Sequence, residues 1–189
     1  MINMIFGKSR GIKSDFGFKV MSWVFAVRDK LLSPWTLLDA FGIQKGQTVV
    51  DYGCGPGSYL RRASELVGPE GSVFAVDVHE LAIKVVMGRV ERERLSNVAA
   101  VQSDGESCPL ADETADRIYA LDMFHMVRQP AAFLRELNRI CKRKGFLYID
   151  NGHQSRDEVT LKIASSGAWE IVEQKKRYLK CRPTAVGSE

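Results

Sequence analysis

The chain has 189 residues, 45% of them apolar, which is enough to bury the core of one domain of ordinary size. Its formal net charge of +4 is small beside 27 basic and 23 acidic residues, so charge alone does not indicate a nucleic-acid partner. Four cysteines, at positions 54, 108, 141 and 181, lack the paired spacing of a zinc site, and we expect no metal. No leader is evident, and no apolar run approaches the roughly 20 residues that cross a bilayer. We therefore expect a cytoplasmic protein without a transmembrane segment.

The N-terminal region differs in character from the rest of the chain. Residues 1–14 carry no periodicity and predict a mobile arm. Residues 16–32 predict a helix that is apolar around much of its circumference and ends before Ser33-Pro34. Such a helix either packs on the sheet or forms a lid over a ligand. We expect a division into an arm and lid helix, residues 1–34, and a ligand-binding domain, residues 35–189.

A glycine-rich turn follows the first buried strand of that domain. The apolar pair Val49-Val50 leads into Asp51, and glycines then occupy positions 53, 55 and 57. Glycine accepts positive φ and lacks a Cβ, so the backbone of such a turn can approach a ligand closely. The segment therefore predicts a strand, a tight turn that binds a ligand, and a helix.

The spacing of these glycines argues against a phosphate-binding turn. A dinucleotide fingerprint needs its third glycine at the position of Ser58, and a phosphate loop needs a Gly-Lys-Ser/Thr sequence that is absent. Pro56 also removes one backbone N–H that would face a pyrophosphate. A ligand without phosphate is favoured.

Strand and helix patterns alternate through the rest of the chain. Helices are expected at 35–41, 59–67, 81–95, 130–144 and 156–166, and strands at 72–77, 98–103, 116–121 and 146–150, followed by a hairpin at 168–173 and 176–181. Asp77 ends the second strand, and Asp104-Gly105 follows the third. Open α/β sheets bind ligands at the carboxyl ends of their strands, so these residues are candidate contacts. Alternatively, Asp77 caps the helix that begins near Glu80.

The segment Asp51-Tyr52-Gly53-Cys54-Gly55-Pro56-Gly57 resembles the first motif of class I S-adenosylmethionine-dependent methyltransferases, of the type 11 and quinone-biosynthesis kinds. The resemblance extends over about residues 35–183. It implies a Rossmann-like three-layer α/β sandwich with a seven-stranded, mostly parallel sheet and an antiparallel last strand. It also implies S-adenosyl-L-methionine as cofactor and S-adenosyl-L-homocysteine as product. The cofactor contacts implied are Asp51, Gly53, Cys54, Gly55, Gly57, Asp77, Val78, Asp104, Gly105 and Leu121.

Within this resemblance, the acids have separate roles. The resemblance implies that Asp51 helps to hold the amino-acid end of the cofactor and that Asp77 binds the two ribose hydroxyls. It also implies that Asp104 accepts a hydrogen bond from the exocyclic amine of adenine. Gly105 lies close to the adenine ring.

Methyl transfer mainly requires alignment of the acceptor with the sulfonium, so no fixed catalytic triad is expected. An acceptor of high pKa would need a base, for which His125, His153 and Asp122 are candidates. A lone histidine in an apolar setting is, however, more often structural, and Cys108 is more simply an incidental cysteine than a reactive thiol.

The acceptor is expected to be a small-molecule or lipid-like compound. No Asn-Pro-Pro-aromatic motif follows the fourth strand, which disfavours nucleic acid, and the cysteine clusters of arsenite methyltransferases are missing. Phe18, Trp23 and Phe25 would contribute an apolar acceptor pocket. Two other classes stay open: a non-catalytic cofactor-binding protein and a dinucleotide-dependent oxidoreductase. The sequence does not decide between a monomer and a homodimer.

Overall fold

The computed structural model describes residue 17 and residues 34–184. The predicted arm and lid helix, with Phe18, Trp23 and Phe25, lie outside the described residues apart from residue 17. The division at residue 34 therefore stays a prediction.

Strands and helices alternate along the described chain. The elements are η1 (Pro34–Phe41), β1 (Thr48–Tyr52), α2 (Leu60–Val67), β2 (Ser72–Asp77), α3 (Glu80–Glu93), β3 (Val98–Gln102), β4 (Ala115–Ala120), η2 (Phe124–Met126), α4 (Pro130–Ile140), β5 (Cys141–Ile149), α5 (Arg156–Ser166), β6 (Trp169–Gln174) and β7 (Leu179–Pro183). The element at 35–41 is present as predicted, in 3-10 form. Gly68 and Gly167 end α2 and α5 with positive φ, as expected of helix-terminal glycines.

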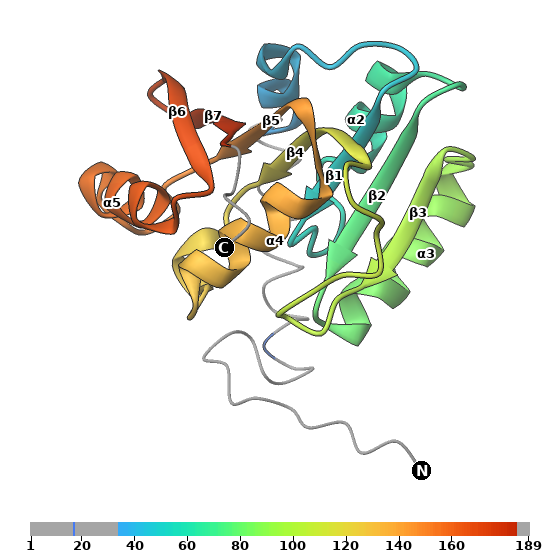
Figure 1. The fold of residues 1–189 in the computed structure, drawn as a ribbon. Helices are drawn as coiled ribbons and strands as arrows, with labels where there is room; N and C mark the ends of the chain where they lie inside the picture. The colour runs from blue at the N-terminus through green and yellow to red at the C-terminus, as the bar shows by residue number, and fades with distance from the viewer. Residues whose placement is uncertain (1–16, 18–33, 185–189) are drawn as a thin grey trace.

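The strands form one seven-stranded sheet in the order β3-β2-β1-β4-β5-β7-β6 (Figure 1). The first five strands pair in parallel, and β7 runs antiparallel to both of its neighbours. The predicted mostly parallel sheet with an antiparallel last strand is therefore confirmed. Strand order reverses between β1 and β4, and the carboxyl ends of both strands lie at the same edge of the sheet as that of β2. This reversal point is where open α/β sheets bind ligands.

Two apolar cores lie on opposite faces of the sheet, which makes three layers. Successive residues of β4 alternate between them: Ile118 and Ala120 pack with α4 and α5, whereas Tyr119 packs with η1, α2 and α3. Tyr148 of β5 packs in the same core as Tyr119. Its hydroxyl donates a 2.5 Å hydrogen bond to the carbonyl of Phe41. Because both faces are covered, the parallel strands read as nearly continuous apolar runs.

The predicted boundary between α4 and β5 is wrong. The helix expected at 130–144 ends at Ile140, and β5 begins at Cys141 in extended conformation. Gly145, predicted to stop that helix, lies inside β5, where a Cβ would come within 2.6 Å of the Cys141 Sγ and 3.0 Å of the Ala115 carbonyl oxygen. It is therefore a site of close backbone approach within a strand. Lys142 Nζ lies 2.8 Å from an Asp116 carboxylate oxygen instead of ending a helix.

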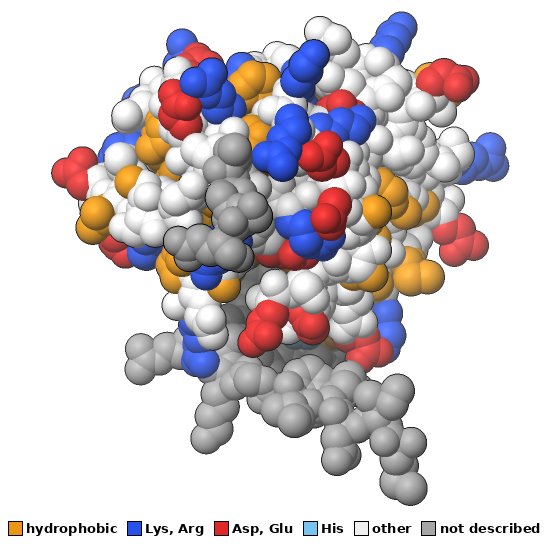
Figure 2. Space-filling model, in the orientation of Figure 1, with side chains coloured by type: hydrophobic (Ala, Val, Ile, Leu, Met, Phe, Trp, Pro, Cys, Tyr) orange, Lys and Arg blue, Asp and Glu red, His pale blue; other side chains and the backbone are white. Residues whose placement is uncertain are grey.

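Basic and acidic side chains are interspersed over the described part of the face in Figure 2, without a continuous patch of one sign. Within the part of the chain that the structure describes, no helix has the length and apolar character to cross a membrane.

Candidate functional site

The turn after β1 is hydrogen-bonded to the end of β2. The backbone N–H groups of Gly53 and Cys54 both donate to the carbonyl of Val76, at 2.8 and 3.0 Å. Gly53, Gly55 and Gly57 have φ values of 80°, 51° and 82°, which L side chains rarely adopt. The alternation of glycines therefore has a conformational cause.

Two of the three glycines also have a packing cause. A Cβ on Gly53 would lie 2.7 Å from Cγ of Met123, in the segment after β4, and one on Gly57 would lie 2.7 Å from Cδ1 of Leu60. Gly57 thus gives α2 room to start against the turn. The sequence reasoning assigned Gly57 to the ligand and missed this role, which depends on a contact three residues further along the chain.

Asp77 joins the turn to the end of β2. Its Oδ2 accepts the Gly55 N–H at 2.9 Å, and its Oδ1 accepts the His79 N–H at 2.8 Å. His79, not Asp77, supplies the side-chain cap of α3, because its Nδ1 accepts the Leu81 N–H at 3.2 Å. Burial raises the pKa of Asp77, and each carboxylate oxygen keeps a further lone pair for a ligand hydroxyl.

Asp51 is a buried acid at the end of β1, with 2% of its surface exposed. Burial, reinforced by the negative charges of Asp77 and Asp122, raises its pKa well above the ordinary value, and the neighbouring Tyr119 hydroxyl opposes this rise. The Tyr119 hydroxyl does not, however, reach it with hydrogen-bond geometry, and Asp51 Oδ2 has no partner among the described residues. An orphaned buried carboxylate oxygen calls for a cationic or hydrogen-bond-donating group.

The loop after β3 is organised by Ser103, which the sequence reasoning missed. Its Oγ donates to the Ser107 carbonyl at 2.7 Å and accepts the Gly105 N–H at 3.0 Å. The same Oγ lies 3.2 Å from the hydroxyl of Tyr52 on β1. The sequence feature that could have predicted this role is a small polar residue directly before Asp104-Gly105.

Asp104 is folded onto its own loop. Its Oδ1 accepts the N–H groups of Glu106 and Ser107 at 2.8 and 2.7 Å, and these bonds lower the pKa of Asp104. Beside it, Val78 is 53% exposed and lies 3.6 Å from the position of a Cβ on Gly105. An exposed apolar side chain next to a glycine offers a surface on which a flat ring can lie.

Cys54 and Leu121 contribute differently from the other predicted contacts. Both side chains are buried in the core shared with η1, α2 and α3, and their contact with a cofactor stays a prediction. Burial raises the pKa of the Cys54 thiol and, likewise, that of Cys108.

A second group of polar residues lies at the carboxyl ends of β4 and β5. Asp122 has φ of 60°, and its N–H donates a 3.0 Å hydrogen bond to Oδ2 of Asp150. Burial and the adjacent Asp122 carboxyl raise the pKa of Asp150 to about 6. The sequence reasoning chose Asp122 and passed over Asp150, although an acid ending the strand next to β4 is the same signal that selected Asp77.

The two candidate histidines are neighbours, with ring centroids 4.8 Å apart in an edge-to-face arrangement. His125 follows β4 in η2, and His153 follows β5. Burial, with the nearby His153, lowers the pKa of His125, and the charge of Asp122 opposes this shift. The structure thus brings together the three candidate bases, Asp122, His125 and His153.

His125 and His153 lie to one side of the predicted cofactor contacts, whereas the Asp122 carboxylate accepts the Tyr59 hydroxyl at 3.4 Å and lies near Asp51. The pairing of Asp51 with Tyr119, and of Ala120 with Ile149, places Gly53, Leu121 and Asp150 at one level of the sheet. Neighbouring strands are about 4.8 Å apart, so Asp150 lies roughly 10 Å from the glycine turn, across β4. The edge therefore has a glycine-rich half and a carboxylate–histidine half.

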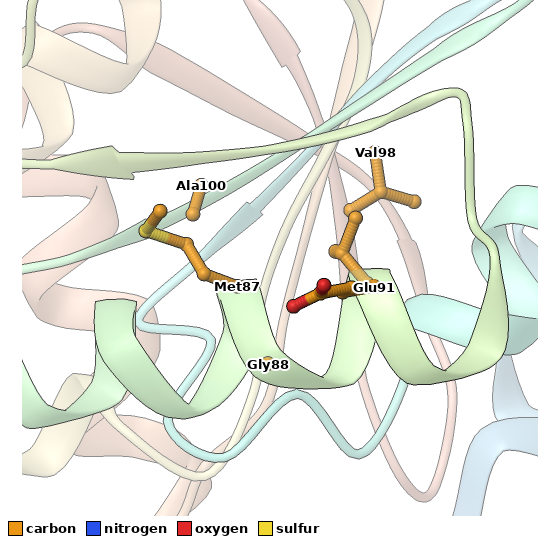
Figure 3. Close-up of a pocket in the computed structure, with 6 residues that line it drawn as sticks. Met87, Gly88, Glu91, Val98 and Ala100 are labelled. Carbon is orange, nitrogen blue, oxygen red and sulfur yellow. The ribbon is translucent and has the colours of Figure 1, made fainter.

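A groove of about 320 Å³ occurs elsewhere, between α3 and the outer strand β3 (Figure 3). Met87 and Glu91 line it from the helix, and Val98 and Ala100 from the strand. Val98 is the first residue of β3, so this groove lies away from the carboxyl edge and is separate from the site.

The fold and the glycine-turn edge define a Rossmann-like nucleoside-cofactor domain of the class I methyltransferase type. The comparison with known families agrees: the family described as "Methyltransferase domain" matches residues 50–149, and the chain belongs to it.

The curated relatives include the ubiquinone/menaquinone biosynthesis C-methyltransferases UbiE of Klebsiella pneumoniae and Escherichia coli, each 33% identical over 115 residues. The match covers 59% of this chain and 45% of each relative, so the chain spans about half the length of the curated relatives it matches.

Among solved structures, an S-adenosylmethionine-dependent methyltransferase from Aquifex aeolicus is 29% identical, with a TM-score of 0.71, over 86% of this chain and 97% of that one. The [4+2]-cyclase SpnF is 18% identical, with a TM-score of 0.60, over 88% of this chain and 62% of that one. The second likeness concerns the fold alone.

Proposed function

We propose that this protein transfers a methyl group from S-adenosylmethionine to a small, hydrophobic acceptor. The observation that carries the proposal is the orphaned, buried Oδ2 of Asp51 beside the glycine turn, with Asp77 at the neighbouring strand end. The first suits a ligand's ammonium group, and the second suits a pair of ribose hydroxyls. Both groups belong to S-adenosylmethionine.

The residues of this edge fit the cofactor part by part. Asp51 would hold the ammonium, the backbone around Gly55 would lie against the methionine and ribose, and Asp77 would accept the ribose hydroxyls. Adenine would lie on the exposed side chain of Val78, beside Gly105, which carries no side chain to block the ring. Asp104 would accept the exocyclic amine through the lone pairs that its own loop leaves free.

The cofactor, when bound, supplies an electrophilic methyl group on a good leaving group. The protein then has to orient the acceptor for in-line attack and keep water out. Met123, half-buried over Gly53, provides apolar surface beside the glycine turn.

The acceptor is proposed to be quinone-like. Support comes from the curated relatives, whose printed names place them in ubiquinone and menaquinone biosynthesis. Neither a dinucleotide nor a purely binding role is supported by a described feature of the site, and Pro56 still removes a donor that a pyrophosphate would use.

The proposal is tested by incubating the protein with tritium-methyl-labelled S-adenosylmethionine and alkylated hydroquinones, and counting label extracted into organic solvent. The wild-type protein should transfer label, and Asp77→Asn should transfer at least about tenfold less at subsaturating cofactor. A protein that binds neither S-adenosylmethionine nor S-adenosylhomocysteine would refute the proposal.

A further inference from the structure

The two edge strands of the sheet differ in how well they are protected against pairing with another chain. At one edge, β6 carries Glu170 and Glu173, and its register with β7 is irregular between Ile171 and Glu173. Charges and bulges of this kind commonly protect an edge. At the other edge, β3 reads Val-Ala-Ala-Val-Gln without a charge, pairs regularly with β2, and has no strand on its outer side among the described residues (Figure 1). β3 is therefore the edge that can accept a further strand.

The backbone of β3 presents hydrogen-bonding groups on its outer side. On the inner side, the Val73 N–H of β2 donates to the Asn97 carbonyl at 2.8 Å. The Ser103 N–H donates to the Asp77 carbonyl of β2 at 2.9 Å. Because alternate residues of a strand point their N–H and C=O groups to the same side, those of Ala100 face away from β2. An antiparallel strand centred opposite Ala100 would pair with both of them.

The groove of about 320 Å³ between α3 and β3 lies beside this edge (Figure 3). Met87 is 59% exposed there, and a Cβ on the adjacent Gly88 would meet no atom within 4 Å. A projecting side chain thus lies directly beside an empty position. Met87 lies level with Ala100, and Glu91 lies level with Val98 (Figure 3).

We infer that this edge is the interface between two copies of the chain, related by a twofold axis beside Ala100. Such an axis pairs β3 antiparallel with its copy, and the two Ala100 residues exchange both of their N–H···O=C bonds. Since α3 contacts both β2 and β3, the two copies of α3 would lie about two strand spacings, roughly 10 Å, apart. Helices pack with their axes about 8–10 Å apart, so α3 of the second copy would fill the groove.

The sequence of α3 is complementary to itself in this arrangement. Ala100 is level with Met87, so the axis passes close to Met87 and Gly88, and Met87 of one copy faces the empty position at Gly88 of the other. One helical turn to either side, Lys84 of one copy faces Glu91 of the other, and the twofold axis repeats this contact. Matching shape and opposite charge across one axis favour a second copy over an unrelated partner. The interface is independent of the reaction proposed above, and its test does not involve the cofactor.

The test is sedimentation velocity of the full chain over a range of concentrations, with the chain mass of 21.1 kDa as the reference. The wild-type protein should sediment as a dimer at the upper concentrations. Gly88→Glu should keep the fold, because its side chain enters open space, and should weaken dimerisation by at least about tenfold. A wild-type protein that stays monomeric throughout, or a Gly88→Glu protein that dimerises equally well, would overturn the inference.

Charge reversal tests the position of the axis. Lys84→Glu and Glu91→Lys each place like charges opposite one another, and each should weaken the dimer by about tenfold or more, whereas the double variant should recover it. The matched control is Arg61→Glu on α2, whose side chain is 70% exposed, and it should leave the dimer unchanged. Circular dichroism melts establish that every variant is folded. A double variant no better than the single ones would contradict the inferred contact.

Hydrogen exchange separates a second copy from another occupant of this edge. The Ala100 amide should be protected in the dimer and should exchange faster in monomeric Gly88→Glu protein. Protection that persists in that monomer would show that another segment of the chain covers β3, and it would overturn the inference.

Discussion

The backbone N–H of Gly55 donates a 2.9 Å hydrogen bond to the carboxylate of Asp77, 22 residues further along the chain. The shape of the glycine turn and the position of the proposed ribose-binding acid are therefore coupled. A change at either residue should affect both ligand binding and the local fold, and separating these effects requires paired variants.

Asp77→Ala should weaken S-adenosylhomocysteine binding by at least about tenfold and also destabilise the protein by about 1–3 kcal/mol, because the N–H groups of Gly55 and His79 lose their acceptor. Asp77→Asn keeps one acceptor oxygen and should recover much of the stability but little of the affinity. Calorimetry and urea unfolding measure the two quantities. A folded Asp77→Ala protein with unchanged affinity would remove Asp77 from the cofactor site.

Asp51→Asn should have opposite effects on stability and binding. In the folded state the pKa of Asp51 is raised above its ordinary value of 3.8 by burial, so the wild-type protein loses stability as pH rises from about 3.8 toward the folded pKa. Removing the ionisable group should therefore raise the free energy of unfolding of the unliganded protein at pH 7, as measured by urea denaturation.

The same substitution should weaken S-adenosylmethionine binding by about tenfold or more, because the ammonium loses its charged partner. 5′-Methylthioadenosine, which lacks the amino-acid end, serves as the control ligand and should bind both proteins equally. Equal losses for the two ligands would place Asp51 away from the ammonium.

Gly57→Ala and Gly55→Ala form a second pair. Gly57→Ala should lower the free energy of unfolding by about 1–3 kcal/mol, because its Cβ would meet Leu60 at 2.7 Å in a backbone conformation of positive φ. Gly55→Ala should cost less stability, about 1 kcal/mol for its φ of 51°, yet lose more cofactor affinity. Thermal melts and S-adenosylhomocysteine titrations of both variants measure this. If the affinity loss followed the stability loss in both, the turn would be purely structural.

The fold was largely predictable because its signals are local. Strand β2 and helix α5 have the predicted bounds. The alternation of strands and helices, with a hairpin at the end, correctly predicted the mostly parallel sheet. The boundary between α4 and β5 was not predictable in the same way. Helical spacing of apolar residues continues through Cys141, and Gly145 looks like a helix stop until its contacts across the sheet are known.

The site shows the same division. Asp51 and Asp77 could be found from the sequence, since each ends an apolar strand. That Gly57 serves packing, that Ser103 holds the β3 loop, and that Asp150 is paired with the Asp122 N–H depend on contacts between segments far apart or on turn geometry. Such contacts leave no periodic pattern in the sequence.

The free energy of unfolding should depend on pH through Asp150, whose pKa burial raises to about 6. Because the folded pKa lies above the ordinary value of 3.8, this contribution to stability should fall as pH rises from about 3.8 to about 6 and level off above it, as measured by urea unfolding. Asp122 from the end of β4 and His125 from η2 are titratable groups near Asp150, and burial with His153 lowers the pKa of His125. Asp150→Asn should abolish this step, whereas a step that persists in the variant would assign it to another group.

The most direct measurement is a calorimetric titration of the full chain with S-adenosylhomocysteine and, separately, with NADH. We expect one site for S-adenosylhomocysteine with Kd below about 100 μM, equivalent to about −5.5 kcal/mol, and no binding of NADH. Binding of NADH, or absence of any heat with S-adenosylhomocysteine in a folded protein, would contradict the assignment of this edge to S-adenosylmethionine.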